Sequence, residues 1–67
     1  MTRDEKYELW LRLEIRNEVR LAKEALRFAR KNTDLSNVVV QQLKRADMHM
    51  DRMKTLAAAL KMFRLSR

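Results

Sequence analysis

The chain has 67 residues, 46% hydrophobic and 37% charged, and contains no glycine, proline or cysteine. A chain of this length is expected to form one domain over 1–67 rather than a multidomain enzyme or a doubly wound nucleotide fold. Lack of glycine and proline disfavours phosphate-cradling loops and tight hairpins, and lack of cysteine excludes disulfides and thiolate metal sites. With a single histidine besides, we expect long helices, no metal and no cofactor.

Sixteen Lys and Arg residues against nine Asp and Glu give a net charge of +7. Such an excess favours a polyanionic partner, whether nucleic acid, a nucleotide or an anionic membrane, although a solvated basic surface is the alternative. The charged segment 1–6 is followed by no long apolar run, so we expect neither a secretion signal nor a membrane span. The prediction is a cytoplasmic protein without a membrane partner.

The sequence predicts two helices separated by one turn. Thr2 and Glu5 have the spacing of a capping box, which predicts a first helix over 3–31. The turn formers of 32–37 interrupt the helical pattern, and we place the turn at 32–36. Asp34 or Ser36 can then cap a second helix over 37–65.

Apolar residues recur in both helices at alternating spacings of three and four, the heptad pattern of packed helices. This predicts an all-α, antiparallel two-helix hairpin in which Val19 lies near Met50. The predicted seam between the helices comprises Ile15, Val19, Ala22, Leu26 and Ala29 of the first helix and Leu43, Ala46, Met50, Met53, Ala57 and Leu60 of the second.

Two helices alone bury too little apolar surface to be stable, so we expect a homo-oligomer, a dimer or higher, such as a four-helix bundle. Surplus apolar residues gather where the hairpin is expected to be open, and they form the predicted oligomer interface. These residues are Leu9, Trp10, Leu13, Leu56 and Phe63. The competing interpretation is a docking surface for a different protein.

A row of cations follows one face of the first helix within about 80° of arc, at 100° per residue. We call Arg12, Arg16, Arg20, Lys23, Arg27 and Arg30 the basic stripe. It is about 27 Å long at 1.5 Å per residue, and Glu14, Glu18 and Glu24 are expected to point elsewhere. Its guanidinium groups suit phosphate, because each offers a bidentate fork.

A shorter row on the second helix, Arg45, His49 and Arg52, is a second candidate anion-binding surface. Alternatively, the basic stripe is a solvated face that pairs with Asp47 or Asp51 of a neighbouring chain. Glu14 and Glu18 border the predicted seam and would pair across chains with Lys54 or Lys61. No nucleophile, base and oxyanion-hole loop come together in the sequence, so we expect no catalytic residues and no enzymatic activity.

The opening of the chain resembles the Rop family of plasmid copy-number proteins, which are dimers of helical hairpins that bind paired RNA loops. The matching residues lie in the first helix and are Met1, Thr2, Glu5, Lys6, Leu9, Ile15, Arg16, Glu24 and Leu26. Where that family presents Asn, Phe and Gln to RNA, this chain has Trp10, Glu14 and Glu18. The resemblance therefore implies the architecture more than the RNA-binding face.

The turn and second helix are similar to phage proteins that sequester the cyclic nucleotide signals of host defence. Leu43, Ala46 and Met48 fall on that family's Thr-x-Leu-x-x-Ala-x-Met-Trp helix, with Thr33 at a turn serine. The substitutions are Asp34 and Leu35 for Arg-Glu, Gln41 for the threonine and His49 for the tryptophan. This similarity implies a small, basic helical oligomer that binds nucleotides.

Together these patterns predict a plasmid or viral accessory protein that binds RNA or a small signalling nucleotide, for example as an inhibitor of host defence. The alternative is a protein-binding inhibitor or adaptor that docks on a host protein through its apolar open end.

Overall fold

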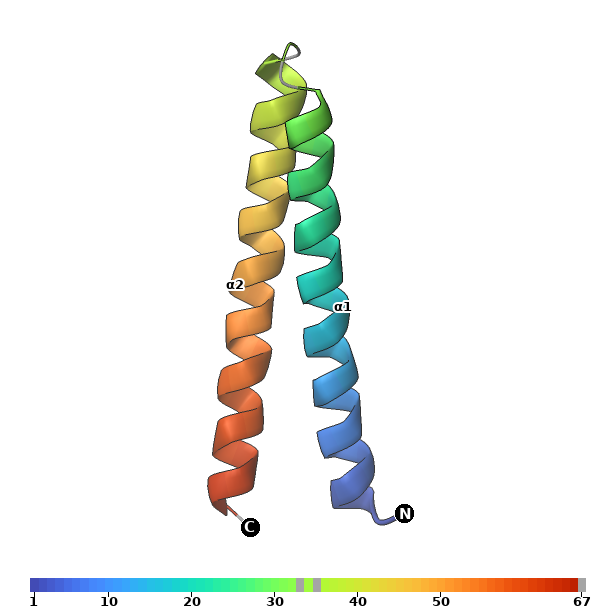
Figure 1. The fold of residues 1–67 in the computed structure, drawn as a ribbon. Coiled ribbons are helices and arrows are strands. Elements are labelled where there is room, and N and C mark those ends of the chain that lie inside the picture. The colour runs from blue at the N-terminus through green and yellow to red at the C-terminus, as the bar shows by residue number, and fades with distance from the viewer. Residues whose placement is uncertain (33, 35, 67) are drawn as a thin grey trace.

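The computed structural model describes residues 1–32, 34 and 36–66, and shows an antiparallel pair of long helices (Figure 1). Helix α1 spans Arg3–Lys31 and helix α2 spans Ser36–Ser66, where the sequence led us to expect 3–31 and 37–65. Both chain ends lie at the same end of the hairpin. No strand occurs among the described residues, so the predicted all-helical hairpin is confirmed. Thr33 and Leu35, named in the phage resemblance, lie outside the described residues.

Local hydrogen bonds explain where α1 begins and ends. The Thr2 hydroxyl accepts a hydrogen bond of 3.2 Å from the Glu5 backbone N–H, as the capping pattern predicts. At the other end, both the backbone N–H and the side-chain Nδ2 of Asn32 donate to the Phe28 carbonyl, at 3.2 and 2.9 Å. Asn32 thereby satisfies a carbonyl that the last turn of the helix would otherwise leave free.

The seam between the helices contains mostly alanine. The buried apolar residues are Leu11, Ala22, Ala25, Ala29 and Ala46, and one charged residue, Glu18, is buried with them. This corrects the predicted seam, of which only Ala22, Ala29 and Ala46 are buried. Leu26, Leu43 and Met50 are instead 36%, 44% and 41% exposed.

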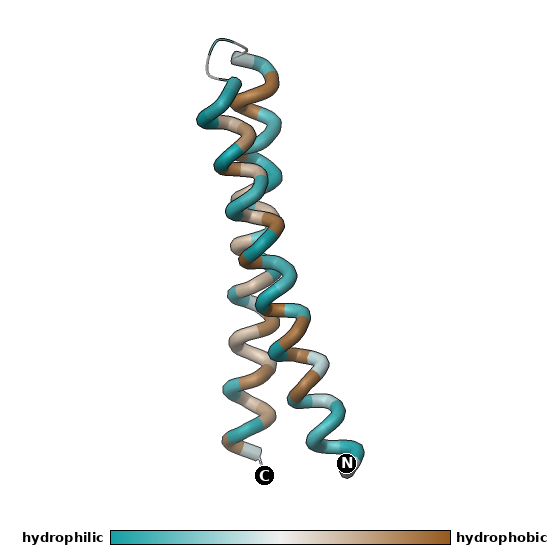
Figure 2. The backbone as a smooth tube through the Cα atoms, turned by 45° about the vertical axis from the view of Figure 1, so that its right-hand side comes forward, coloured by the Kyte–Doolittle hydropathy of each residue, from teal (hydrophilic) through white to brown (hydrophobic). Residues whose placement is uncertain are grey.

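The physical reason for the correction is side-chain size. Each helix has an apolar stripe wider than one seam, and rotating α1 to bring Ala25 inward lets the backbones approach closely. The helices lie closest near the turn and diverge toward the termini (Figures 1 and 2). At the open end larger groups span the gap: the Tyr7 ring meets the Phe63 ring edge-on at 5.0 Å. There Arg64 Nε also donates to Glu8 Oε1 at 2.8 Å.

The hairpin is a single layer of helix with two broad faces. Its extents are 50 × 19 × 11 Å, and its radius of gyration is 15.3 Å, whereas a compact domain of this length has about 11 Å. Its accessible surface is 5531 Å², against about 4,500 Å² for a compact monomer of the same mass. Apolar segments remain along both helices (Figure 2), so one chain leaves much of its apolar surface in water.

Replacing Ala22 with leucine should overpack the seam and lower the free energy of unfolding by about 1–3 kcal/mol. Ala22 is only 6% exposed, so the larger side chain must push the helices apart. Ala58→Leu, on an exposed part of α2, is the matched control and should change stability little. Urea unfolding of both variants checks this; an unchanged or more stable Ala22→Leu would mean that the helices do not pack through Ala22.

Candidate functional site

The basic stripe lies along the part of α1 that faces away from α2. All six of its residues are exposed, and the helical spacing places them 80° or more from Ala22 at about 100° per residue. Within the described part of the chain, five of them take part in no ion pair: Arg12, Arg16, Lys23, Arg27 and Arg30. Their positive charge is therefore available to an anion from solution.

Four stripe residues line one shallow depression of about 490 Å³ on α1: Arg16, Arg20, Lys23 and Arg27. One expectation needs correction here, because Glu24 does not point elsewhere. Arg20 donates to Glu24 Oε1 at 3.0 Å and to Asn17 Oδ1 at 2.9 Å, and Glu24 also lines the depression. Since both members of the Arg20–Glu24 pair are more than half exposed, solvent screening makes it weak, and the depression keeps a large positive excess.

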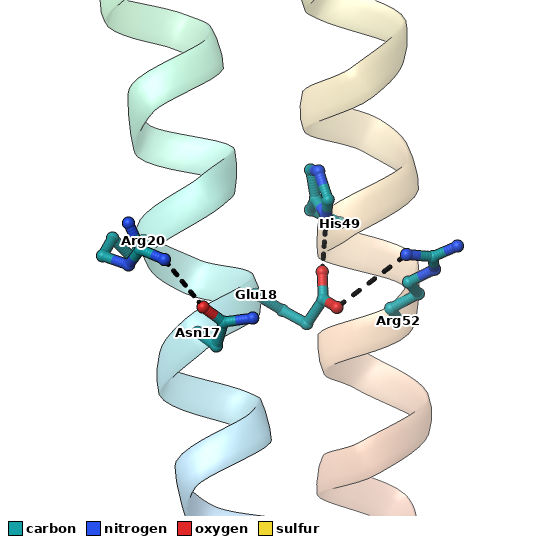
Figure 3. Close-up of polar contacts among 5 residues, drawn as sticks. All are labelled: Asn17, Glu18, Arg20, His49 and Arg52. Carbon is teal, nitrogen blue, oxygen red and sulfur yellow. Dashed lines mark hydrogen bonds and ion pairs between the residues drawn. The ribbon is translucent and has the colours of Figure 1, made fainter.

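The second predicted row does not join the basic stripe, and its middle member is not on the surface. His49 turns into the seam, where its Nδ1 donates a hydrogen bond to Glu18 Oε2 (Figure 3). Arg52 Nη1 stands 4.0 Å from the other carboxylate oxygen of Glu18. Arg45 lines a hollow with Leu21, Phe28 and His49, away from the stripe. Glu18 is thus partnered within its own chain by two residues of α2.

The Glu18 cluster, which we define as Glu18, His49 and Arg52, is a buried polar contact between the helices that the sequence did not lead us to expect. The carboxylate reaches across from α1 and lies between the two α2 side chains (Figure 3). The Glu18 and His49 side chains are 9% and 14% exposed, whereas Arg52 is 59% exposed. A buried carboxylate must be paired, so this cluster constrains which residues of the two helices can face each other.

A signal for this cluster was present in the sequence. Leu11, Glu18 and Ala25 are spaced seven residues apart on α1. Gln42, His49 and Leu56 have the same spacing on α2. These positions form a second heptad, one residue before the predicted one in each helix. Opposed polar residues at matching heptad positions are the pattern that indicates a buried polar pair.

A hollow beside the Glu18 cluster is not suited to an anion. It has a volume of about 780 Å³ and is lined by Glu14, Glu18, Lys44, Asp47, Met48, Asp51, Arg52, Thr55 and Leu56. Four carboxylates outnumber two cations there, so a phosphate would be repelled. Among the described residues no group of three or more His, Asp or Glu side chains could hold a metal ion.

The residues of the predicted oligomer interface divide into two groups. Leu9, Trp10 and Leu13 are 42%, 51% and 52% exposed. Leu56 and Phe63 are half-buried, and Phe63 contacts Tyr7 across the open end. Trp10 stacks on Tyr7 with a ring-centroid distance of 6.2 Å. The two apolar patches therefore meet through aromatic rings, while the three residues of α1 remain open to contact.

In the part of the chain that the structure describes, neither helix has a stretch long and apolar enough to cross a membrane. No family model, no curated protein and no solved structure matches the chain.

Removing one member of the Glu18 cluster should lower the free energy of unfolding more than replacing Glu18 and His49 together with apolar residues. His49→Ala leaves the buried carboxylate with Arg52 alone and should lower the free energy of unfolding by about 1–3 kcal/mol. The double variant Glu18→Leu with His49→Leu replaces both polar groups with apolar ones and should be near neutral or stabilising. Thermal and urea unfolding measure both; a double variant less stable than His49→Ala would mean that the cluster contributes net stability.

Proposed function

We propose that this chain is a non-enzymatic, oligomeric protein that binds a phosphate-bearing ligand, RNA or a signalling nucleotide, along the basic stripe. The observation that carries the proposal is the row of six exposed cations, of which Arg20 alone is engaged by a carboxylate among the residues that the structure describes. Like charges three and four residues apart in a helix repel each other. Stability alone does not favour such a row, whereas an anionic ligand would turn the repulsion into attraction.

The chemistry of the stripe favours phosphate over a simple counter-ion. Five of its six residues are arginine, whose planar guanidinium binds phosphate through two parallel hydrogen bonds. The depression that holds Arg16, Arg20, Lys23 and Arg27 would suit a small nucleotide. The full stripe, about 27 Å long at 1.5 Å per residue, would let an RNA strand make several contacts in succession. Cytoplasmic accessory roles, of the plasmid or phage kind, fit such a ligand.

A second candidate function rests on the open end of the hairpin. Leu9, Trp10 and Leu13 are each more than 40% exposed on one helix, and an exposed tryptophan beside leucines is typical of a protein-binding surface. In this function the chain would be an inhibitor or adaptor docked on a host protein. Salt separates the two functions, because phosphate binding weakens steeply with salt and apolar docking does not.

The test of phosphate binding replaces Arg16, Arg20 and Arg27 with glutamine, which keeps helix propensity while removing charge. Affinity for a single-stranded RNA homopolymer and for cyclic nucleotides should be lost. For any residual RNA binding, the slope of log affinity against log salt concentration should be shallower by about 0.7 for each lost phosphate contact. The matched control, Lys44→Gln with Lys54→Gln and Lys61→Gln, removes the same charge from exposed positions of α2 and should bind almost as the parent does.

Fluorescence anisotropy at several salt concentrations measures both triple variants, and circular dichroism verifies that both are helical. If the two variants lose equal affinity, binding follows net charge and the stripe is no site. If neither loses affinity, the stripe is a solvated face. Weak, salt-insensitive binding of a protein partner that Trp10→Ala abolishes would favour the adaptor function.

A further inference from the structure

We infer that a second copy of this chain docks on one broad face of the hairpin, in the apolar groove beside the seam. The methionine groove, as we name it, is lined by Val19, Ala22 and Leu26 of α1 and by Met50 and Met53 of α2, and has a volume of about 220 Å³. This inference rests on the oligomer of the proposed function and places its interface on the side of the hairpin, away from the open end.

The first argument is the pattern of side chains that the rotated seam leaves outside. Val19 and Leu26 are one heptad apart on α1, and Leu43 and Met50 are one heptad apart on α2. All four carry apolar side chains at the spacing of packed helices, yet Leu26, Leu43 and Met50 are 36% to 44% exposed in a single hairpin. Both helices thus present an apolar row to the same face, as a packed third and fourth helix require.

The accessible surface of a single hairpin is also larger than a compact monomer would expose. The chain exposes roughly 1,000 Å² more surface than a compact monomer of its mass, and each partner in a stable interface buries about 800 Å². One face of a hairpin with extents of 50 by 19 Å is large enough to supply that area. A second copy on the methionine groove would bury the surplus, and a two-layer bundle would replace the single layer.

The opposite face is less suited to a second copy. The hollow on that side is lined partly by Glu24, Arg45 and His49. Charged groups there would have to lose water or find partners in the other copy, which costs free energy. Of the described residues that line the methionine groove, by contrast, two are charged: Glu18, which is already paired with His49, and Lys23.

Two methionines provide a matched test. Met48 and Met50 lie on the same helix with almost equal exposure, 42% and 41%, but only Met50 lines the methionine groove. Lysine at either position keeps its charge in water in a lone hairpin, whereas a lysine at position 50 would be buried in the interface. Met50→Lys should therefore weaken dimerisation at least about tenfold, while Met48→Lys should leave it near the parent's value.

Sedimentation equilibrium without RNA should give the parent twice the chain mass of 8.1 kDa. Because a lone hairpin has a thin core, helicity is also followed on dilution. The protein concentration at which half of the helicity is lost should rise at least about tenfold for Met50→Lys alone.

A monomeric parent, or equal effects of the two variants, would overturn the inference. A larger effect of Met48→Lys or Trp10→Lys would place the second copy on the opposite face or at the open end. Stripe variants that keep the dimer but lose RNA would separate the two proposals.

Discussion

Alanine in the seam is the constraint on which the rest of this structure depends. Among the described residues, four of the five buried apolar side chains are alanine, and their small size lets the two helices approach closely near the turn. Close approach leaves no room between the helices for the leucines and methionines of the wider apolar stripes. Those side chains remain on the faces, so one hairpin is a thin layer whose stability is expected to depend on being covered.

The Glu18 cluster complements this seam. Alanine against alanine contributes little to choosing one alignment of two long helices, because a single methyl group buries little area. A buried carboxylate that must meet His49 and Arg52 removes that freedom. The contact of Glu18 with His49 lies one residue along each helix from the expected proximity of Val19 to Met50. Val19 and Met50 also line the same groove, so the expected register is consistent with the structure, while the faces are rotated.

The parts of the fold predicted from sequence are those set by local chemistry. The Thr2 cap, the turn formers after Lys31 and the heptads are encoded within a few residues of one another, which is why two helices and their pairing could be foreseen. The face of each helix that turns inward could not be foreseen, because two heptad patterns, offset by one residue, run along both helices. Deciding between them requires weighing alanine contacts and the buried Glu18–His49 hydrogen bond against leucine and methionine burial. Neither helix reveals that balance alone.

The same reasoning applies to the candidate site. The basic stripe could be located from spacing because six cations on an outer face need no partner to be placed. The role of His49 could not be located from the spacing within one helix, because it depends on Glu18, which is 31 residues away in sequence. Glu24 was misplaced for a simpler reason: Arg20 is flexible enough to reach a carboxylate four residues ahead, at the edge of the stripe.

Charge connects the two proposals. Each chain carries +7, and Val19 and Lys23 line both the methionine groove and the depression of the basic stripe. A second copy in the groove would therefore bring two rows of arginine to the rims of one interface, where they repel each other at low ionic strength. A polyanion bound along those rims would neutralise both rows at once. On this account ligand binding and assembly strengthen each other, because whatever pairs the arginines with phosphate also removes the main electrostatic cost of covering the apolar face.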